Sequence, residues 1–155
     1  MKTFVLSLIV LSASLTFAAP KAPKAEPKKG WSDNYAGSLA QAKEEKKLVL
    51  LDFTGSDWCG WCMKLDEEVF SKSQFKNFAK KSLVLVELDY PHGKQQTEEV
   101  KKQNSELKSK FGISGYPTLI LVDAEGKEVT RWVGYKKDLL DELKDKAATP
   151  KPEAK

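Results

Sequence analysis

Short apolar runs recur along the middle of the chain, and each is typical of a strand buried inside a sheet. They cover Leu48–Phe53, Leu83–Leu88 and Thr118–Val122. A fourth run, Lys127–Val133, follows Asp123-Ala124-Glu125-Gly126, a sequence that predicts a hairpin turn. We therefore expect four strands, with the last two paired as a hairpin.

The segments between these runs carry apolar residues at helical spacing among many charged ones. The expected helices cover Ser32–Lys47, Met63–Phe70, a short stretch from Ser71 or Ser73 to Ala79, Thr97–Lys110 and Asp138–Lys146. Because a helix separates the first two strands, they are expected to pair in parallel through a crossover. The pattern predicts an α/β fold with a central mixed β-sheet flanked by helices.

The two ends of the chain lack this periodicity. Residues 1–19 combine Lys2, an apolar stretch and small residues placed for cleavage after Ala18 or Ala19, which is typical of a secretory signal peptide. Residues 20–30 and 147–155 consist mostly of Pro, Lys, Ala and Glu, and we expect a disordered linker and a disordered tail. One domain, residues 31–146, remains, and it is long enough for a single core.

The distribution of charge and the signal-like segment both limit the functions that the sequence supports. The formal net charge is +4, much of it in the two ends, and Arg131 is the only arginine, so the sequence does not favour nucleic-acid binding. The apolar stretch of residues 1–19 is short for a membrane span, so we expect a soluble exported protein, with an uncleaved anchor as the alternative. Outside the cytosol, disulfides are available as substrates.

The chemistry centres on Cys59 and Cys62, the only cysteines, which stand two residues apart just after the first strand. Cys59 should lie at the start of the following helix, where free backbone N–H groups and the helix dipole stabilise a thiolate. Cys62 should lie one turn further in and be shielded. This arrangement suits exchange, in which Cys59 attacks a substrate disulfide and Cys62 releases the product.

Three other interpretations of the cysteines are less favoured. A structural bridge across two residues would remove little loop entropy. A closed zinc site needs four ligands, and adding the single His92 gives only three, so a second copy of the chain would be required. Inert buried thiols fit poorly with the flanking Trp58 and Trp61, because large aromatic residues on a loop usually mark a contact surface. Redox chemistry without a cofactor or metal is favoured.

The order of motifs resembles the thioredoxin family. It comprises Leu-Asp-Phe at residues 51–53, Trp58-Cys59-Gly60-Trp61-Cys62, Gly115-Tyr116-Pro117-Thr118, and the closing hairpin with Gly126-Lys127 and Val133-Gly134. The run from Thr54 to Cys62 and the residues after it are most similar to small exported thioredoxin-like proteins, among them DsbH-type periplasmic reductases. The resemblance implies a thioredoxin fold over residues 31–146, with a helical insertion, Tyr90–Lys110, before the cis-proline loop.

The resemblance also implies roles. Cys59 would be the nucleophile, Cys62 the resolving thiol, and Pro117 a cis-proline facing them. Trp58, Trp61, Tyr116 and Pro117 would bind the substrate. The partners implied are disulfide-containing exported proteins and a membrane-embedded thiol reductant of the DsbD kind as electron donor, and the protein would be a periplasmic monomer.

Two acidic residues depart from the thioredoxin plan. Asp52 matches a buried family acid but is one residue further from Cys59, and Glu87 stands where thioredoxins carry a lysine in the next strand. If both lie near the dithiol they disfavour further negative charge and make the pair reducing; the alternative is that Glu87 is exposed on an edge. We expect a protein-disulfide reductase, with an isomerase or oxidase of the same fold, or a non-catalytic chaperone or adaptor, as alternatives.

Overall fold

The computed structural model describes residues 24–148. The expected signal peptide, linker residues 20–23 and tail residues 149–155 lie outside this range. In chain order, the elements are α1 (Tyr35–Glu45), β1 (Leu48–Thr54), α2 (Gly60–Leu65), the π-helical turn η1 (Asp66–Phe70), α3 (Ser73–Ser82), β2 (Leu83–Asp89), α4 (Glu98–Lys110), β3 (Thr118–Val122), β4 (Glu128–Val133) and α5 (Leu139–Ala148). Within residues 24–148, no helix is long and apolar enough to cross a bilayer.

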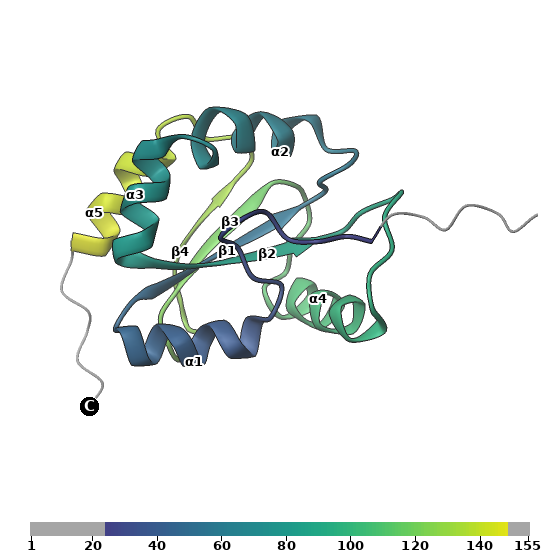
Figure 1. Ribbon diagram of the computed structural model, residues 1–155, viewed down its shortest axis with the longest axis horizontal. Coiled ribbons are helices and arrows are strands. Elements are labelled where there is room, and N and C mark those ends of the chain that lie inside the picture. Colours follow the sequence, from purple (N-terminus) through teal and green to yellow (C-terminus); the bar gives the residue numbers. More distant parts are fainter. Residues whose placement is uncertain (1–23, 149–155) are drawn as a thin grey trace, which may run out of the picture.

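The four strands form one sheet in the order β2-β1-β3-β4. β1 pairs in parallel with β2 and antiparallel with β3, and β3 pairs antiparallel with β4. Helices α1 and α4 cover one face, and α2, α3 and α5 cover the other (Figure 1). The expected mixed sheet, parallel crossover, closing hairpin and helical insertion are therefore confirmed.

Each face of the sheet has its own apolar core, because side chains alternate along β1. Val49, Leu51 and Phe53 belong to the core under α1 and α4, whereas Leu50 belongs to the core under α2, α3 and α5. Burial on both faces explains why the central strands are continuous apolar runs. By the same alternation, Asp52 points to the face that α2 covers.

The helix after the cysteines is less regular than expected. A single helix over Met63–Phe70 was predicted, but α2 begins at Gly60 and gives way to the wider turn η1 after Leu65. The N–H of Ser71 closes this turn by donating to the carbonyl of Asp66 at 2.8 Å. Such π turns occur frequently at functional sites.

The segment before α1 differs from the expected disordered linker. Within residues 24–30, the N–H of Ala25 donates to the carbonyl of Gln95 at 2.8 Å. Beyond it, Ser32 pairs with the outer edge of β2. The N–H of Ser32 donates to the carbonyl of Leu85 at 3.0 Å, and the carbonyl of Ser32 accepts the N–H of Glu87 at 2.9 Å. The segment therefore covers an edge strand that would otherwise present unpaired backbone groups. The contacts run through the backbone, which an apolar pattern does not reveal. At the other end, α5 continues to Ala148, past the expected boundary at residue 146.

Candidate active site

Cys59 and Cys62 are joined in a disulfide at the start of α2. Cys59 is the N-cap of this helix, and the N–H of Cys62 donates to its Sγ at 3.2 Å. In the reduced state, this donor and the helix dipole favour negative charge on the Cys59 sulfur. The structure thus brings the two sulfurs together and places Cys59 where the sequence predicted.

The expected difference in shielding is small in this oxidised state. Cys59 is 7% exposed and Cys62 is 5% exposed. The chemical difference between the two sulfurs therefore rests on the hydrogen bond from the N–H of Cys62 and on the position of Cys59 at the helix end, rather than on unequal burial.

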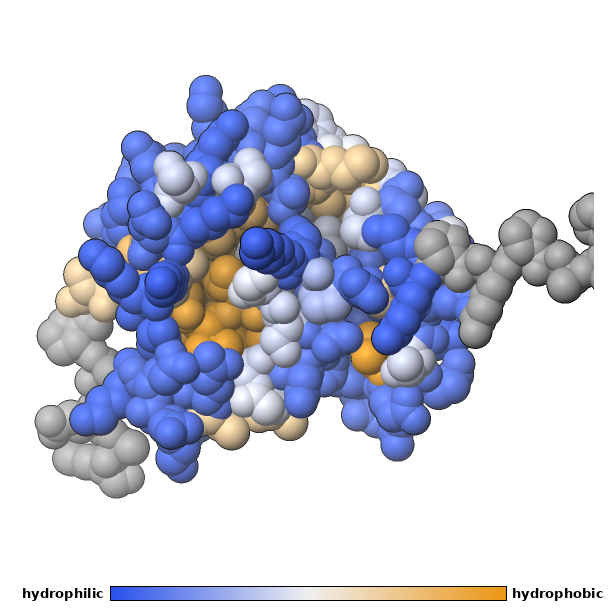
Figure 2. Space-filling view, in the orientation of Figure 1, coloured by the Kyte–Doolittle hydropathy of each residue, from blue (hydrophilic) through white to orange (hydrophobic). Residues whose placement is uncertain are grey.

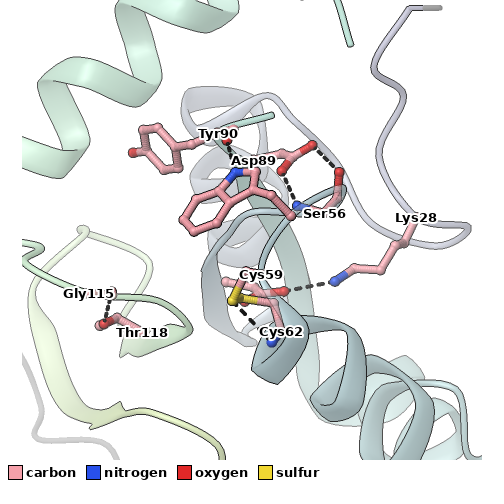
Figure 3. The surroundings of a disulfide bond; sticks show 10 residues. Lys28, Ser56, Cys59, Cys62, Asp89, Tyr90, Gly115 and Thr118 are labelled. Atoms are coloured by element: carbon pink, nitrogen blue, oxygen red, sulfur yellow. Dashed lines mark hydrogen bonds and ion pairs between the residues drawn. A yellow bond between two sulfur atoms is a disulfide. The ribbon is translucent and has the colours of Figure 1, made fainter. Parts of the chain in front are cut away.

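The loop that carries Cys59 is fixed by residues at the ends of two strands. Ser56, just after β1, donates its N–H to Asp89 at 2.8 Å and its hydroxyl to the same carboxylate at 2.6 Å, as Figure 3 shows. The N–H of Cys59 donates to the carbonyl of Gly55 at 2.9 Å. A Cβ on Gly55 would lie 2.4 Å from the Trp58 ring, so this close approach requires glycine.

Two tryptophans flank the disulfide but are held differently. Trp58 donates its indole N–H to the carbonyl of Tyr90 at 2.8 Å and stacks on His92 with the ring centroids 4.7 Å apart. Trp61 is 59% exposed and has Tyr135 and the ammonium of Lys64 as its ring neighbours. Trp58 is therefore part of a packed cluster, whereas Trp61 is available to a partner.

Asp57 attaches the insertion to the cysteine loop. Its carboxylate accepts the N–H groups of His92 at 3.0 Å and Gly93 at 2.7 Å. These two hydrogen bonds lower the pKa of Asp57, because they favour the charged carboxylate. The sequence carries no signal for this role of Asp57, because its partners are more than thirty positions away.

In Figure 3, Gly115 of the loop before β3 and Thr118 at the start of β3 lie to the left of the disulfide. The Tyr116–Pro117 peptide bond is cis, as expected. The hydroxyl of Thr118 donates to the carbonyl of Gly115 at 2.8 Å. The N–H of Gly134 donates to the carbonyl of Pro117, also at 2.8 Å. Tyr116 packs edge-on against Trp58 with the centroids 5.6 Å apart, which joins this loop to the aromatic cluster.

An open groove of about 660 Å³ begins at this cluster. Its lining includes Trp58 and Tyr116, Tyr90 and His92 of the insertion, and polar side chains of α4 such as Lys108. The groove therefore reaches Trp58, the residue before Cys59.

The two acids singled out in the sequence lie side by side. Asp52 and Glu87 are register partners in the parallel β1–β2 pair, and they are 1% and 4% exposed. The alternative of an exposed Glu87 is therefore wrong: the segment around Ser32 covers the edge of β2. The predicted closeness of the two carboxylates is confirmed.

Lys28, which the sequence pattern does not predict as a site residue, contacts both of these acids. The ammonium of Lys28 is 2.8 Å from Asp52, 3.2 Å from Glu87 and 3.6 Å from Asp66, at the end of α2. Two buried carboxylates imply a nearby cation. This need for a cation was the only indication of Lys28 in the sequence, and it does not identify which lysine supplies the charge.

Burial and charge oppose each other in this cluster. Burial raises the pKa of Asp52 and of Glu87, and Lys28 acts against that rise in both. Burial alone lowers the pKa of Lys28, but Asp52 and Glu87 outweigh it and raise that pKa overall. Lys28 therefore stays charged, and it partly offsets the cost of ionising the two acids.

Comparisons with known proteins agree with this geometry. The family model described as a thioredoxin-like domain matches residues 35–146. The chain is 42% identical over 99 residues to the disulfide bond reductase DsbH of Chlamydia pneumoniae, a stretch that covers 64% of this chain and 60% of DsbH. It is 35% identical over 127 residues to the thioredoxin-related protein DsbJ of the same organism, covering 82% of this chain and 36% of DsbJ.

A solved structure of a DsbH oxidoreductase superposes with a TM-score of 0.70 at 34% identity, over 90% of this chain and 96% of that one. The chain spans less than two thirds of the length of the two curated relatives, DsbH and DsbJ. The family match itself covers most of the present chain and includes the disulfide, the cis-proline loop and all four strands. The chain therefore belongs to the thioredoxin-like family.

Proposed function

We propose that this protein is a thiol-disulfide oxidoreductase that reduces protein disulfides through Cys59 and Cys62. The observation that carries the proposal is the Cys59–Cys62 disulfide at the start of α2, with the N–H of Cys62 directed at the Cys59 sulfur. The similarity to DsbH over most of the domain supports it.

In the proposed reaction, the reduced protein begins with a Cys59 thiolate. This thiolate attacks one sulfur of the client disulfide, forms a mixed disulfide and releases the other client sulfur as a thiolate, which takes up a proton. Cys62 then loses its proton and attacks Cys59, and the second client thiol leaves. Two electrons pass to the client, and the protein ends in the disulfide state seen here.

The charges near the cysteines favour electron flow from the dithiol to the client. Strong oxidants in this chemistry stabilise the thiolate of the attacking cysteine, and so their reduced form. Here the residues between the cysteines, Gly60 and Trp61, carry no charge, and the nearby buried cluster holds two carboxylates against one ammonium. A neighbouring excess of negative charge disfavours a thiolate, which supports a reducing pair.

We propose that clients bind as extended segments across the aromatic residues. Trp61 is exposed enough to cover an apolar client side chain, and the groove beside Trp58 and Tyr116 can receive the chain that follows. The backbone beside Pro117 would offer hydrogen bonds to the client.

The signal-like residues 1–19 support export to the periplasm. There, a membrane-embedded thiol reductant would return the Cys59–Cys62 disulfide to its dithiol form. DsbD, a thiol:disulfide interchange protein that is 29% identical to this chain over 99 residues, is a candidate of that chemical class.

The redox potential tests the proposal. We expect a value nearer to the roughly −270 mV of thioredoxin than to the roughly −120 mV of DsbA, measured at equilibrium with glutathione. The protein should also accelerate the reduction of insulin by dithiothreitol. A potential above about −200 mV would favour the oxidase or isomerase alternative, and activity that survives loss of both cysteines would favour a chaperone or adaptor.

A further inference from the structure

The segment Lys24–Gly30, here called the N-terminal strap, inserts one side chain into the buried acids beside the redox pair. Figure 3 shows the Lys28 side chain reaching from the strap toward the region of Cys59 and Cys62. Its ammonium contacts Asp52 at 2.8 Å and Glu87 at 3.2 Å. These two acids lie on different strands, so a single side chain connects β1 and β2 on the face that α2 covers.

The strap is shaped to deliver this charge. The backbone N–H of Lys28 also donates to Glu87, at 2.7 Å, and the carbonyl of Lys28 accepts the N–H of Trp31 at 2.8 Å. The ammonium lies over the rings of Trp31, 4.6 Å from its centroid, and Phe70, 5.0 Å from its centroid. Backbone, ion pairs and aromatic faces therefore all define the place of one lysine.

Asp52 depends on Lys28 for its pairing. Its Oδ2 receives the ammonium, while its buried Oδ1 has no hydrogen-bond partner among the described residues. A buried carboxylate without a cation is costly and keeps its proton to a higher pH. Loss of Lys28 would therefore raise the pH at which the two acids ionise, and above that pH it would leave two buried negative charges without their cation.

The cluster is connected to the helix that carries the cysteines. Asp66, whose carboxylate lies 3.6 Å from the Lys28 ammonium, is the C-cap of α2, and its N–H donates to the carbonyl of Cys62. Asp52 belongs to β1, the strand that leads into the cysteine loop. Lys28 thus contacts an acid on each of the two elements that hold the disulfide.

We propose that Lys28 is a positioning residue of the redox site: from the strap, its ammonium offsets the negative charge of Asp52 and Glu87 and so sets how readily Cys59 forms a thiolate. The effect of Lys28 on the Cys59 thiolate is independent of the proposed function; only its consequence for disulfide reduction rests on that function. Lys28 acts through the two acids and touches neither sulfur. The charged groups that face it are Asp52 on β1, Glu87 on β2 and Asp66 at the end of α2; Asp89, at the end of β2, adds a further negative charge near Asp52.

The test uses the full chain in its reduced form and four variants. Lys28→Met removes the ammonium, Lys28→Arg keeps a cation, and Lys29→Met is the matched control, because Lys29 is an exposed neighbour on the same strap. The double variant Lys28→Met/Glu87→Gln removes one positive and one negative charge, so the net charge of the cluster is the same as in the wild type. The rate of Cys59 alkylation by iodoacetamide is measured from pH 5 to 10, together with thermal unfolding.

In Lys28→Met, we expect the pH midpoint of alkylation to rise, because at the alkaline pH where the thiol ionises the two acids are also ionised and are no longer offset by the ammonium. The rate measured at the pH of the wild-type midpoint should fall by about three- to tenfold. Lys28→Arg and Lys29→Met should keep the wild-type midpoint. The double variant should return most of the way to it, even if it is less stable.

An unchanged midpoint in folded Lys28→Met would overturn the proposal. So would a double variant shifted further than Lys28→Met, because that order would indicate damage to packing rather than an effect of charge. If Lys28→Met fails to fold, the pH midpoints of the double variant and of Lys28→Arg are compared with the wild-type midpoint instead, and a clear shift in either would overturn the proposal. None of these measurements uses a protein substrate, so failure of the wild type to reduce insulin would be a separate result that bears on the proposed function.

Discussion

The two sides of the disulfide differ in how the chain holds their side chains. On the outer side, aromatic rings meet solvent: Trp61 is more than half exposed. On the inner side, Asp52 and Glu87 are almost completely buried and share one ammonium, that of Lys28. An exposed ring can be replaced with little effect on the fold, whereas each buried charge determines the protonation of its neighbours. The outer side is therefore suited to partner choice and the inner side to control of the sulfur chemistry.

The surface agrees with this division. In the view of Figure 2, hydrophilic residues cover most of the molecule, and apolar residues are exposed in limited areas between them. The exposed large apolar residues within the described range include Trp58, Trp61 and Met63, all on or beside α2. Apolar residues gathered next to a reactive pair indicate a contact surface.

The largest effect should come from the cysteines, where the two sides meet. Cys59→Ser removes the attacking sulfur, so insulin reduction should fall about a thousandfold or more, to background. Cys62→Ser leaves the attack intact but blocks release, so the variant should accumulate mixed disulfides with its clients. Non-reducing gels and mass spectrometry of the trapped species measure this. Trapping by Cys59→Ser alone would reverse the two roles.

The second effect concerns the inner side, where Glu87 should make the free energy of unfolding depend on pH. The pKa of Glu87 is raised in the folded protein, chiefly by burial. Between its unfolded pKa, about 4.3, and its higher folded value, the native state holds the proton more tightly, so this group's contribution to stability is lost as pH rises through that window. Glu87→Gln should therefore flatten the fall in the free energy of unfolding above about pH 4.

Urea unfolding of the wild type and of Glu87→Gln at intervals from pH 4 to 8 measures this effect. The difference between the two curves isolates Glu87, because acids with lowered pKa values, such as Asp57 and Glu128, contribute equally to both. Glu68→Gln is a control on the exposed surface of η1. A difference curve that rises with falling pH, in favour of the variant, would show that Lys28 outweighs burial and that the pKa of Glu87 is lowered instead.

The same variant should also change the redox potential. Glu87→Gln leaves Asp52 as the one buried acid paired with Lys28, so a thiolate at Cys59 should be easier to form. The potential should therefore become less negative by a few to a few tens of millivolts, since about 30 mV corresponds to tenfold in the equilibrium constant. This direction is opposite to the one expected for Lys28→Met. Equal shifts in the same direction would mean that charge does not govern the pair.

The two sides also differ in how far the sequence predicted them. Cys59, Cys62 and the two tryptophans are contiguous, and the strand-to-helix pattern around them already places Cys59 at a helix start. The four strands were predicted for the same reason: burial on both faces produces apolar runs. Residues that are adjacent in the sequence are also adjacent in this part of the structure, so the sequence pattern alone is enough to predict it.

The inner side depends on contacts between distant positions. Lys28 is 24 residues from Asp52 and 59 from Glu87, and it lies in a stretch whose Pro, Lys and Ala content is typical of a linker. A single lysine reaching into a buried site leaves no periodic signal. The π turn η1 was missed for a related reason, because its residues have ordinary helical composition and only the hydrogen-bond pattern reveals the extra width.

The smallest effect should come from the outer side. Trp61 lies beside Cys62 with its ring mostly in solvent, and its neighbours Tyr135 and Lys64 contribute no hydrogen bond to the indole within the described residues. Trp61→Ala should therefore leave thermal stability nearly unchanged. It should lower kcat/KM for insulin by about two- to fivefold, or about 0.4–1 kcal/mol, through lost contact with the client. Reduction of a small disulfide such as hydroxyethyl disulfide, which reaches only the sulfurs, should be unaffected.

The control for Trp61→Ala is Val129→Ala, which removes an exposed apolar side chain on β4, away from the cysteine loop, and should change neither rate. Steady-state rates with both substrates, measured at the same concentration of reductant, provide the comparison. Equal losses on insulin and on the small disulfide would mean that Trp61 acts on the thiols themselves. In that case the outer side would share in control of the sulfur chemistry, and the division between the two sides of the disulfide would not hold.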